Sequence, residues 1–246
     1  MKYISSIIHG PPGSGKTTLA NTLPGPRLFL DSEGGAAYLP NDPVVWNMLE
    51  DDEPPGDLTD PNLTVIVDIN DWDMYRIAMA YILSEHPFKS VIIDSLTEIQ
   101  TQLKERINPQ QGIGEEYERN SHNIWDQLLV HLERDVRAMR NLTRPSSPVQ
   151  CNTCIVVLSD TEMVPRKPLV QGSLRKRLPQ FCDMVGYLDV VVDGQGTKRR
   201  ALQIEGTTAV EAKCRIPALN ELYPAGVIYD PNFRKITKQI QPKEQA

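Results

Sequence analysis

The chain of 246 residues has no run of 18 or more apolar residues, so no segment of it is predicted to span a membrane. Its first residues hold one lysine and a short apolar run that leads into a glycine-rich segment. This pattern predicts a first β-strand and not a signal peptide, so we expect a cytoplasmic protein.

Cysteine is scarce, with Cys151, Cys154, Cys182 and Cys214 as the whole set. The first two form a C-x-x-C pair, but no second closely spaced pair accompanies them, and one pair alone is a weak signal for zinc. Reduced thiols beside a strand, in a reducing cytoplasm, are the favoured interpretation. A zinc site built from all four cysteines stays open as the alternative.

The chain has no excess of positive charge. It carries 32 acidic and 26 basic residues and a net charge of −6, so any nucleic-acid site must be a local basic patch. The charges are segregated along the chain. Residues 28–75 contain twelve Asp or Glu and no Lys or Arg, whereas residues 162–200 contain eight Lys or Arg against four acids. We expect an acidic surface loop at about 40–62.

Short apolar runs alternate with helical patterns. Such runs are typical of strands buried on both faces of a parallel sheet, and the alternation predicts a doubly wound, mainly parallel α/β fold. One domain is expected over residues 1–240, with a disordered tail at 241–246. The predicted strands are 3–8, 27–31, 63–67, 90–94, 154–159 and 187–192, and the predicted helices are about 16–22, 72–85, 95–107 and 121–142.

The stretch "HGPPGSGKTT" follows the first apolar run and opens the first predicted helix. It contains the complete Walker A pattern, in which backbone N–H groups surround the β-phosphate of a nucleotide. Lys16 is expected to reach the β- and γ-phosphates, Thr17 to bind Mg²⁺, and Thr18 to contact the α-phosphate. The predicted phosphate-binding residues are Gly10, Pro11, Pro12, Gly13, Ser14, Gly15, Lys16, Thr17 and Thr18.

A carboxylate is expected to complete the magnesium site. Asp94 ends the apolar strand "VIIDS", and it would hold Mg²⁺ through water. The Asn-Lys-x-Asp pattern of guanine-specific proteins is absent from the chain. The expected cofactors are therefore ATP and Mg²⁺.

ATP hydrolysis needs a group that orients the attacking water. Many ATPases place a glutamate directly after the aspartate of the second motif, but here Ser95 follows Asp94. The other usual position is the exit of the strand after the first helix, where "LFLDSEGG" offers Glu33. At this point the sequence resembles the RecA-type ATPase core, and that resemblance gives Glu33 the water-polarising role.

The resemblance can be narrowed. The order of "GPPGSGKTTLA", "LFLDSEGG", "VIIDSLTEI", "KPLVQGSLRKRLPQFCDMVGYL" and "EAKCR" is similar to that in phage-encoded RecA-core ATPases of the single-strand annealing and recombination group. This implies a DNA-stimulated ATPase in the host cytoplasm. It also implies a homo-oligomeric ring or filament on single-stranded DNA, with nucleotide at subunit interfaces and a single-strand binding protein as a possible partner.

Lys213 and Arg215 form a K-x-R pattern on a predicted strand, so both side chains are expected on one face of it. In RecA-like relatives, including KaiC and bacterial RadA, such a pair reaches into the neighbouring subunit's nucleotide. By this resemblance Lys213 and Arg215 are candidate catalytic cations that act in trans. Exposed edge-strand charges are the alternative.

The same resemblance predicts two DNA-binding loops, at 108–123 and 160–180. The first contains Tyr117, which could stack on a base, but its glutamates disfavour phosphate contact. Ser159 or Thr161 is a candidate contact to the γ-phosphate. The second loop supplies the candidate DNA-binding cations Arg166, Lys167, Arg175, Lys176 and Arg177.

Two other function classes remain open at this stage. In a nucleotide or small-molecule kinase, residues 162–177 would serve as a basic lid. In a scaffold that does not hydrolyse ATP, the nucleotide would only fix the oligomeric state. Stimulation of turnover by DNA separates the recombination ATPase from the scaffold, and oligomerisation separates both from the kinase.

Overall fold

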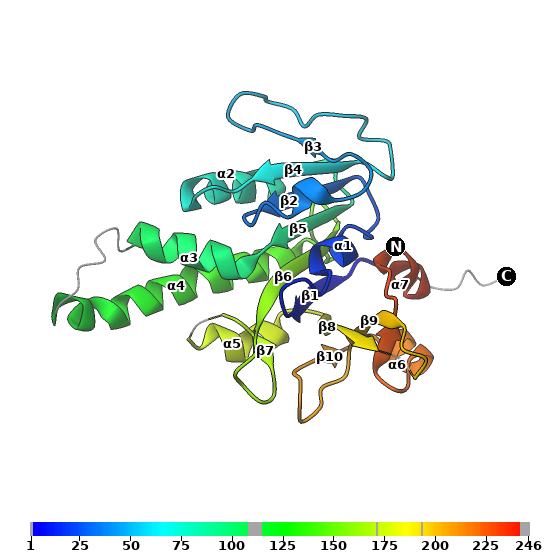
Figure 1. The fold of residues 1–246 in the computed structure, drawn as a ribbon. Helices are drawn as coiled ribbons and strands as arrows, with labels where there is room; N and C mark the ends of the chain where they lie inside the picture. Colours follow the sequence, from blue (N-terminus) through cyan, green and yellow to red (C-terminus); the bar gives the residue numbers. More distant parts are fainter. Residues whose placement is uncertain (1, 108–114, 171, 193, 242–246) are drawn as a thin grey trace.

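The computed structural model describes residues 2–107, 115–170, 172–192 and 194–241. A large, mostly parallel sheet forms its centre, with helices on both faces (Figure 1). The strands are β1 Ser5–Gly10, β2 Arg27–Asp31, β3 Val44–Val45, β4 Thr64–Asp68, β5 Ser90–Asp94, β6 Asn152–Asp160, β7 Lys167–Pro168, β8 Met184–Val192, β9 Lys198–Gln203, β10 Lys213–Cys214 and β11 Val227–Tyr229. The α-helices are α1 Lys16–Ala20, α2 Trp72–Ile82, α3 Leu96–Ile107, α4 Glu115–Asn141, α5 Leu174–Arg177, α6 Pro217–Leu222 and α7 Phe233–Gln239, and the 3₁₀ turns are η1 Ala36–Tyr38 and η2 Leu178–Gln180.

The strand order is β11-β9-β8-β1-β6-β5-β2-β4-β3, with β10 paired to β8 and β7 to β6. The strands from β8 through β1, β6, β5 and β2 to β4 pair in parallel. All six predicted strands are present, which confirms the doubly wound α/β fold. Because parallel strands end at the same edge, the segments that follow β1, β2 and β5 lie together there.

Two apolar layers hold the helices on the sheet. On one face, α2, α3 and α4 pack through buried side chains that include Tyr75, Leu103 and Met139. On the other face, α1, α6 and α7 pack through Leu19, Leu219 and other apolar residues. At about 25 cal/mol per Å² of buried apolar surface, these layers supply the main stabilisation of the fold.

The acidic segment at 40–62 is anchored at the sheet edge, although most of it is exposed. β3 pairs in parallel with β4. Trp46 is only 2% exposed, lies edge-on to Tyr81, and donates its indole N–H to the carbonyl of Asp51. The predicted acidic loop is therefore attached to the sheet through β3 and packs around the buried side chain of Trp46.

The two ends of the described chain meet. Gln241, the first residue of the predicted tail, exchanges hydrogen bonds with the backbone of Lys2, so this residue is held and not part of a free tail. Residues 242–246 lie outside the described residues, as do 108–114 of the first predicted DNA loop. Among the described helices, none is long and apolar enough to cross a membrane.

Candidate nucleotide-binding site

The loop between β1 and α1 has the backbone that a phosphate-binding loop requires. Gly15 has a φ of 92°, a backbone angle that residues other than glycine rarely adopt. A Cβ at Gly10 would lie 2.2 Å from the carbonyl oxygen of Leu188, so only glycine fits there. Within the described part of the chain, the buried hydroxyl of Ser14 has no hydrogen-bond partner. The predicted loop of residues 10–18 is thus tightly closed, with an unused hydroxyl within it.

Lys16 lies at the centre of this loop and is 8% exposed. Its ammonium donates to the carbonyls of Gly10 and Pro11, at 3.1 and 2.9 Å. Burial lowers the pKa of Lys16, and the nearby carboxylates of Glu33 and Asp94 partly oppose that shift. The loop therefore holds its cation beside two carboxylates that belong to other strands.

Asp94 ends β5 and is 2% exposed. Thr17 hydrogen-bonds to the carboxyl group of Asp94, whose Oδ2 atom has no hydrogen-bond partner among the described residues. Burial, together with the smaller effects of the Glu33 and Asp31 charges, raises the pKa of Asp94 to about 7. A bound metal ion would contact the unpartnered oxygen of this buried carboxyl group and stabilise its ionised form, so Thr17 and Asp94 fit a magnesium site. Bound there, Mg²⁺ would neutralise charge on the phosphates.

Replacing Asp94 with asparagine is expected to stabilise the ligand-free protein more at about pH 8 than at about pH 4. The ordinary pKa of an aspartate is 3.8, so a folded pKa of about 7 means that folding binds a proton between these values. The ionised form is thus penalised progressively as the pH rises from about 4 to 7, by roughly 4 kcal/mol in total. Thermal melts at both pH values measure the difference, and equal shifts at both would contradict the assignment.

Glu33 is held beside Asp94 by the pairing of β2 with β5, which places Asp31 opposite Asp94. The Asp31 carboxylate accepts backbone N–H groups of Glu33, Gly34 and Ala36, and so closes the turn after β2. Ser95 donates its hydroxyl to the Glu33 carboxylate. Ser95, which stands where many ATPases have a glutamate, therefore positions Glu33.

His9, for which no role was predicted from the sequence, links the site to Glu211 in the segment before β10. His9 is fully buried, and its Nε2 lies 2.7 Å from the carbonyl of Glu211, so Nε2 carries the ring hydrogen. Its Nδ1 then accepts from the hydroxyl of Ser159, at 2.8 Å. Burial lowers the pKa of His9 to about 4, so the ring is neutral. In the sequence, the only indication of a role for His9 was its position directly before Gly10.

Thr161, the other γ-phosphate candidate, is exposed.

Lys213 lies in β10 and Arg215 follows it directly, and both side chains reach the same 3₁₀ turn, η2. Lys213 donates to the carbonyl of Pro179, and Arg215 donates to the carbonyl of Gln180 at 3.0 Å. β10 pairs with the start of β8, several residues before the edge where the phosphate loop lies. Within one subunit, neither cation is placed at the nucleotide site, and their action in trans stays a prediction.

Four of the five candidate DNA-binding cations form ion pairs within the chain. Arg166 pairs with Asp189, Lys167 with Glu211, Arg175 with Asp160 and Arg177 with Glu133, at 3.0–3.6 Å. Among the described residues, only Lys176 of this set has no such carboxylate. The 160–180 loop therefore leaves fewer cations without a carboxylate partner than its sequence implied. The side chain of Tyr117, from the first loop, lies outside the described part.

The cysteines show no sign of a metal centre. Cys151, Cys154 and Cys182 are buried, and burial raises the pKa of each to about 12, so these thiols are protonated. Across the described ranges, no three His, Cys, Asp or Glu side chains gather into a group that could hold a metal ion. The favoured interpretation, reduced thiols packed beside a strand, agrees with these contacts.

Comparison with known proteins agrees with this geometry. A family model described as an AAA domain matches residues 2–216, which include the phosphate loop, Glu33, Asp94 and the K-x-R pair. No curated protein matches the chain. The match covers most of the chain and supports an ATP-binding P-loop ATPase. The chain therefore belongs to the AAA domain family.

Proposed function

We propose that this ATPase hydrolyses ATP in response to single-stranded DNA and acts in recombination or strand annealing. The observation that carries the hydrolytic part is the cluster of Lys16, Asp94 and Glu33 at one sheet edge. A cation for the phosphates, a carboxyl group for Mg²⁺ and a carboxylate for water are the three groups that this chemistry requires.

The Glu33 carboxylate is fixed by Ser95, which leaves its other oxygen to accept a hydrogen bond from water. Lys16 would stabilise negative charge on the phosphates as the γ-phosphoryl group departs. The Ser159 hydroxyl, oriented by His9, offers its oxygen at the end of β6, between β1 and β5. These residues position the reactants, because phosphoryl transfer depends mainly on geometry and charge.

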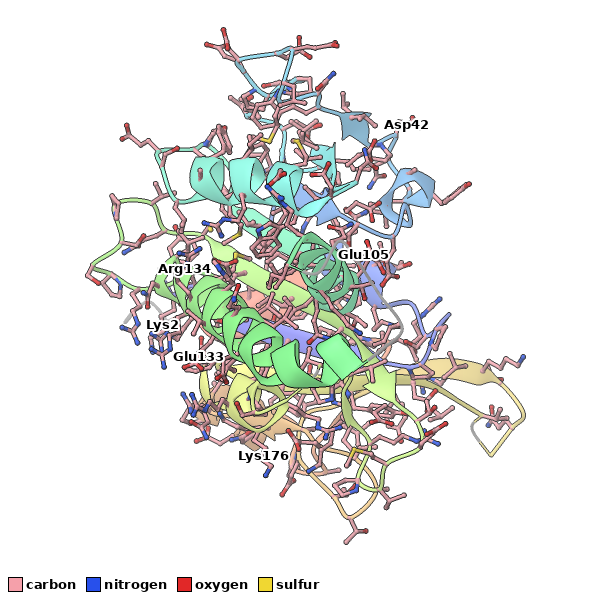
Figure 2. All side chains as sticks on the ribbon, turned by 90° about the vertical axis from the view of Figure 1, so that its left-hand side faces the viewer. Lys2, Asp42, Glu105, Glu133, Arg134 and Lys176 are labelled. Atoms are coloured by element: carbon pink, nitrogen blue, oxygen red, sulfur yellow. The ribbon has the colours of Figure 1, made fainter. Side chains whose placement is uncertain are left out.

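A basic surface on α4 supports the nucleic-acid part of the proposal. Figure 2 looks onto this side of the molecule, where Glu133, Arg134 and Lys176 are labelled. Arg137 and Arg140 both lie against the ring of Phe181, at 5.1 and 5.9 Å. We call this surface the arginine face, and it consists of Arg137, Arg140, Arg144, Lys176, Arg177 and Arg215.

The arginine face carries more positive charge than its own carboxylates neutralise. Glu133 pairs with both Arg137 and Arg177. Within the described part of the chain, Arg140, Arg144 and Arg215 have no carboxylate partner. Burial lowers the pKa of Arg140, and the charges of Arg144 and Arg137 add to that shift. Close, unneutralised guanidinium groups favour the binding of a phosphate backbone.

The proposal includes assembly into a ring or filament with nucleotide at subunit interfaces. Lys213 and Arg215 would have to leave the carbonyls of η2 to reach a neighbour's nucleotide. The kinase alternative is less well supported, because the cations of its lid are largely ion-paired within the chain. The scaffold alternative does not explain why Glu33 is held beside Lys16 and Asp94, because a protein that only binds ATP needs no group to orient water.

Reversing two charges on the arginine face, in the variant Arg140→Glu/Arg144→Glu, is expected to weaken binding of a labelled oligothymidylate about tenfold or more. Stimulation of ATP hydrolysis by the oligonucleotide should fall with it, while turnover without DNA stays the same. Fluorescence anisotropy and phosphate release measure the two effects.

The matched control is Lys235→Glu/Lys238→Glu on α7, which makes the same change in net charge on the opposite face of the sheet. It should leave binding within about threefold of the unmodified protein. If both variants weakened binding equally, the effect would come from the overall charge of the protein and not from the arginine face. Unchanged DNA binding by the Arg140→Glu/Arg144→Glu variant would contradict a role for the arginine face.

A further inference from the structure

Arg200 extends from β9 over the phosphate loop, although it is 186 residues away from Ser14 in sequence. Its Nε donates to the carbonyl of Ser14, at 3.3 Å. A Cβ placed on Gly15 would lie 2.4 Å from the same nitrogen. The Arg200 guanidinium therefore lies directly against the backbone of Gly15, and a side chain at Gly15 would displace it.

The backbone of Arg200 is fixed independently of the loop. Arg200 donates its N–H to the Asp230 carboxylate and accepts the N–H of Asp230, at 3.3 and 2.7 Å. The preceding residue, Arg199, uses its guanidinium to bind that carboxylate, at 2.7 Å. Two adjacent arginines therefore differ in role. Arg199 closes an ion pair, and among the described residues the Arg200 guanidinium has only the Ser14 carbonyl as a partner.

The position of Arg200 in the sheet indicates which part of a nucleotide it would meet. Asp94 and Glu33 reach the loop from β5 and β2, on the β6 side of β1. Arg200 reaches it from β9, beyond β8 on the other side (Figure 1). The loop surrounds the β-phosphate, and the γ-phosphate must face Mg²⁺ and the carboxylates. The nucleoside end is therefore left for the side of Arg200.

We propose that Arg200 is a nucleotide-binding residue that acts within its own subunit and contacts ATP and ADP on the nucleoside side of the β-phosphate. A planar guanidinium can hydrogen-bond to a phosphate oxygen or lie against a base ring, and both contacts fit this position. Arg200 contributes affinity, and it makes no contact with the departing γ-phosphoryl group. The proposal rests on nucleotide binding at residues 10–18 and does not depend on DNA.

The test compares Arg200→Gln with Arg199→Gln, which removes a neighbouring guanidinium from the same strand. Competition against a fluorescent ATP analogue gives the Kd of each protein for ATP and for ADP. Arg200→Gln is expected to raise both values about tenfold and by similar factors, as loss of a charge-assisted hydrogen bond would. Arg199→Gln should change them less than about threefold, and Arg200→Lys should recover part of the affinity.

Turnover at saturating ATP separates this role from a catalytic one. Unchanged kcat in Arg200→Gln, with a thermal melt like that of the unmodified protein, supports the proposal. Unchanged Kd for both nucleotides overturns it. So does a loss for ATP alone accompanied by a large fall in kcat, because that result would place Arg200 at the γ-phosphate. Failure of the unmodified protein to bind ATP would instead overturn the nucleotide site itself.

Discussion

Glu33→Gln is expected to lower kcat for ATP hydrolysis about 100-fold or more, while the Kd for ATP stays within about threefold of its original value. Glutamine keeps the size of the side chain and can still accept the hydrogen bond of Ser95. It cannot polarise water as a carboxylate does. Phosphate release at saturating ATP, together with a direct binding measurement, separates the two parameters.

The matched control is Glu98→Gln, which alters a second carboxylate near Glu33, in the first turn of α3. It should keep kcat within about threefold. A Glu33→Gln protein with near-normal kcat would show that another group orients the water. A large rise in Kd would show that Glu33 acts in binding.

Lys16→Ala is expected to abolish measurable hydrolysis and to weaken ATP binding about 100-fold. The variant removes the buried ammonium and leaves the carbonyls of Gly10 and Pro11 without their donor. Phosphate release and nucleotide competition measure the loss. Lys235→Ala removes an exposed lysine of α7 and should change neither quantity.

A thermal melt of Lys16→Ala tests whether the loop still folds. A small shift with hydrolysis lost supports a direct role for the ammonium. Turnover close to normal in a folded variant would contradict the assignment of the phosphate site.

The sheet edge that carries Lys16, Glu33 and Asp94 was predictable because each of these residues lies at or just beyond the end of a buried apolar strand. "YISSII", "RLFLD" and "SVIID" have the composition of central parallel strands, and parallel pairing brings their carboxyl ends together. The spacing of Gly15, Lys16 and Thr17 then identified the ligand. Glu33 and Asp94 were each predicted at the end of an apolar strand, and the parallel pairing of β2 with β5 brings these two strand ends to the same edge.

The C-terminal part was not predictable in the same way. β9 begins with "KRR", and β10 has two residues, so neither gives an apolar signal. These strands exist because β8 offers an edge for pairing. Arg200 could be recognised as a site residue only after this pairing placed it over Gly15.

The ion pairs of the 160–180 loop were equally hidden in the sequence. Arg177 is 44 residues from its partner Glu133, and Arg166 pairs with Asp189 across β8. A count of basic residues cannot show which charges are neutralised by distant carboxylates. The arginine face was missed for the same reason, since its members come from α4, the turn after α4, α5 and the residue after β10.

The central claim is that ATP hydrolysis by this chain responds to single-stranded DNA. The most direct measurement is phosphate release from Mg²⁺·ATP with and without a single-stranded oligonucleotide, with Lys16→Ala as the blank. We expect turnover to rise at least about tenfold with the oligonucleotide and to vanish in Lys16→Ala. Lys16-dependent turnover that DNA leaves unchanged would contradict the claim.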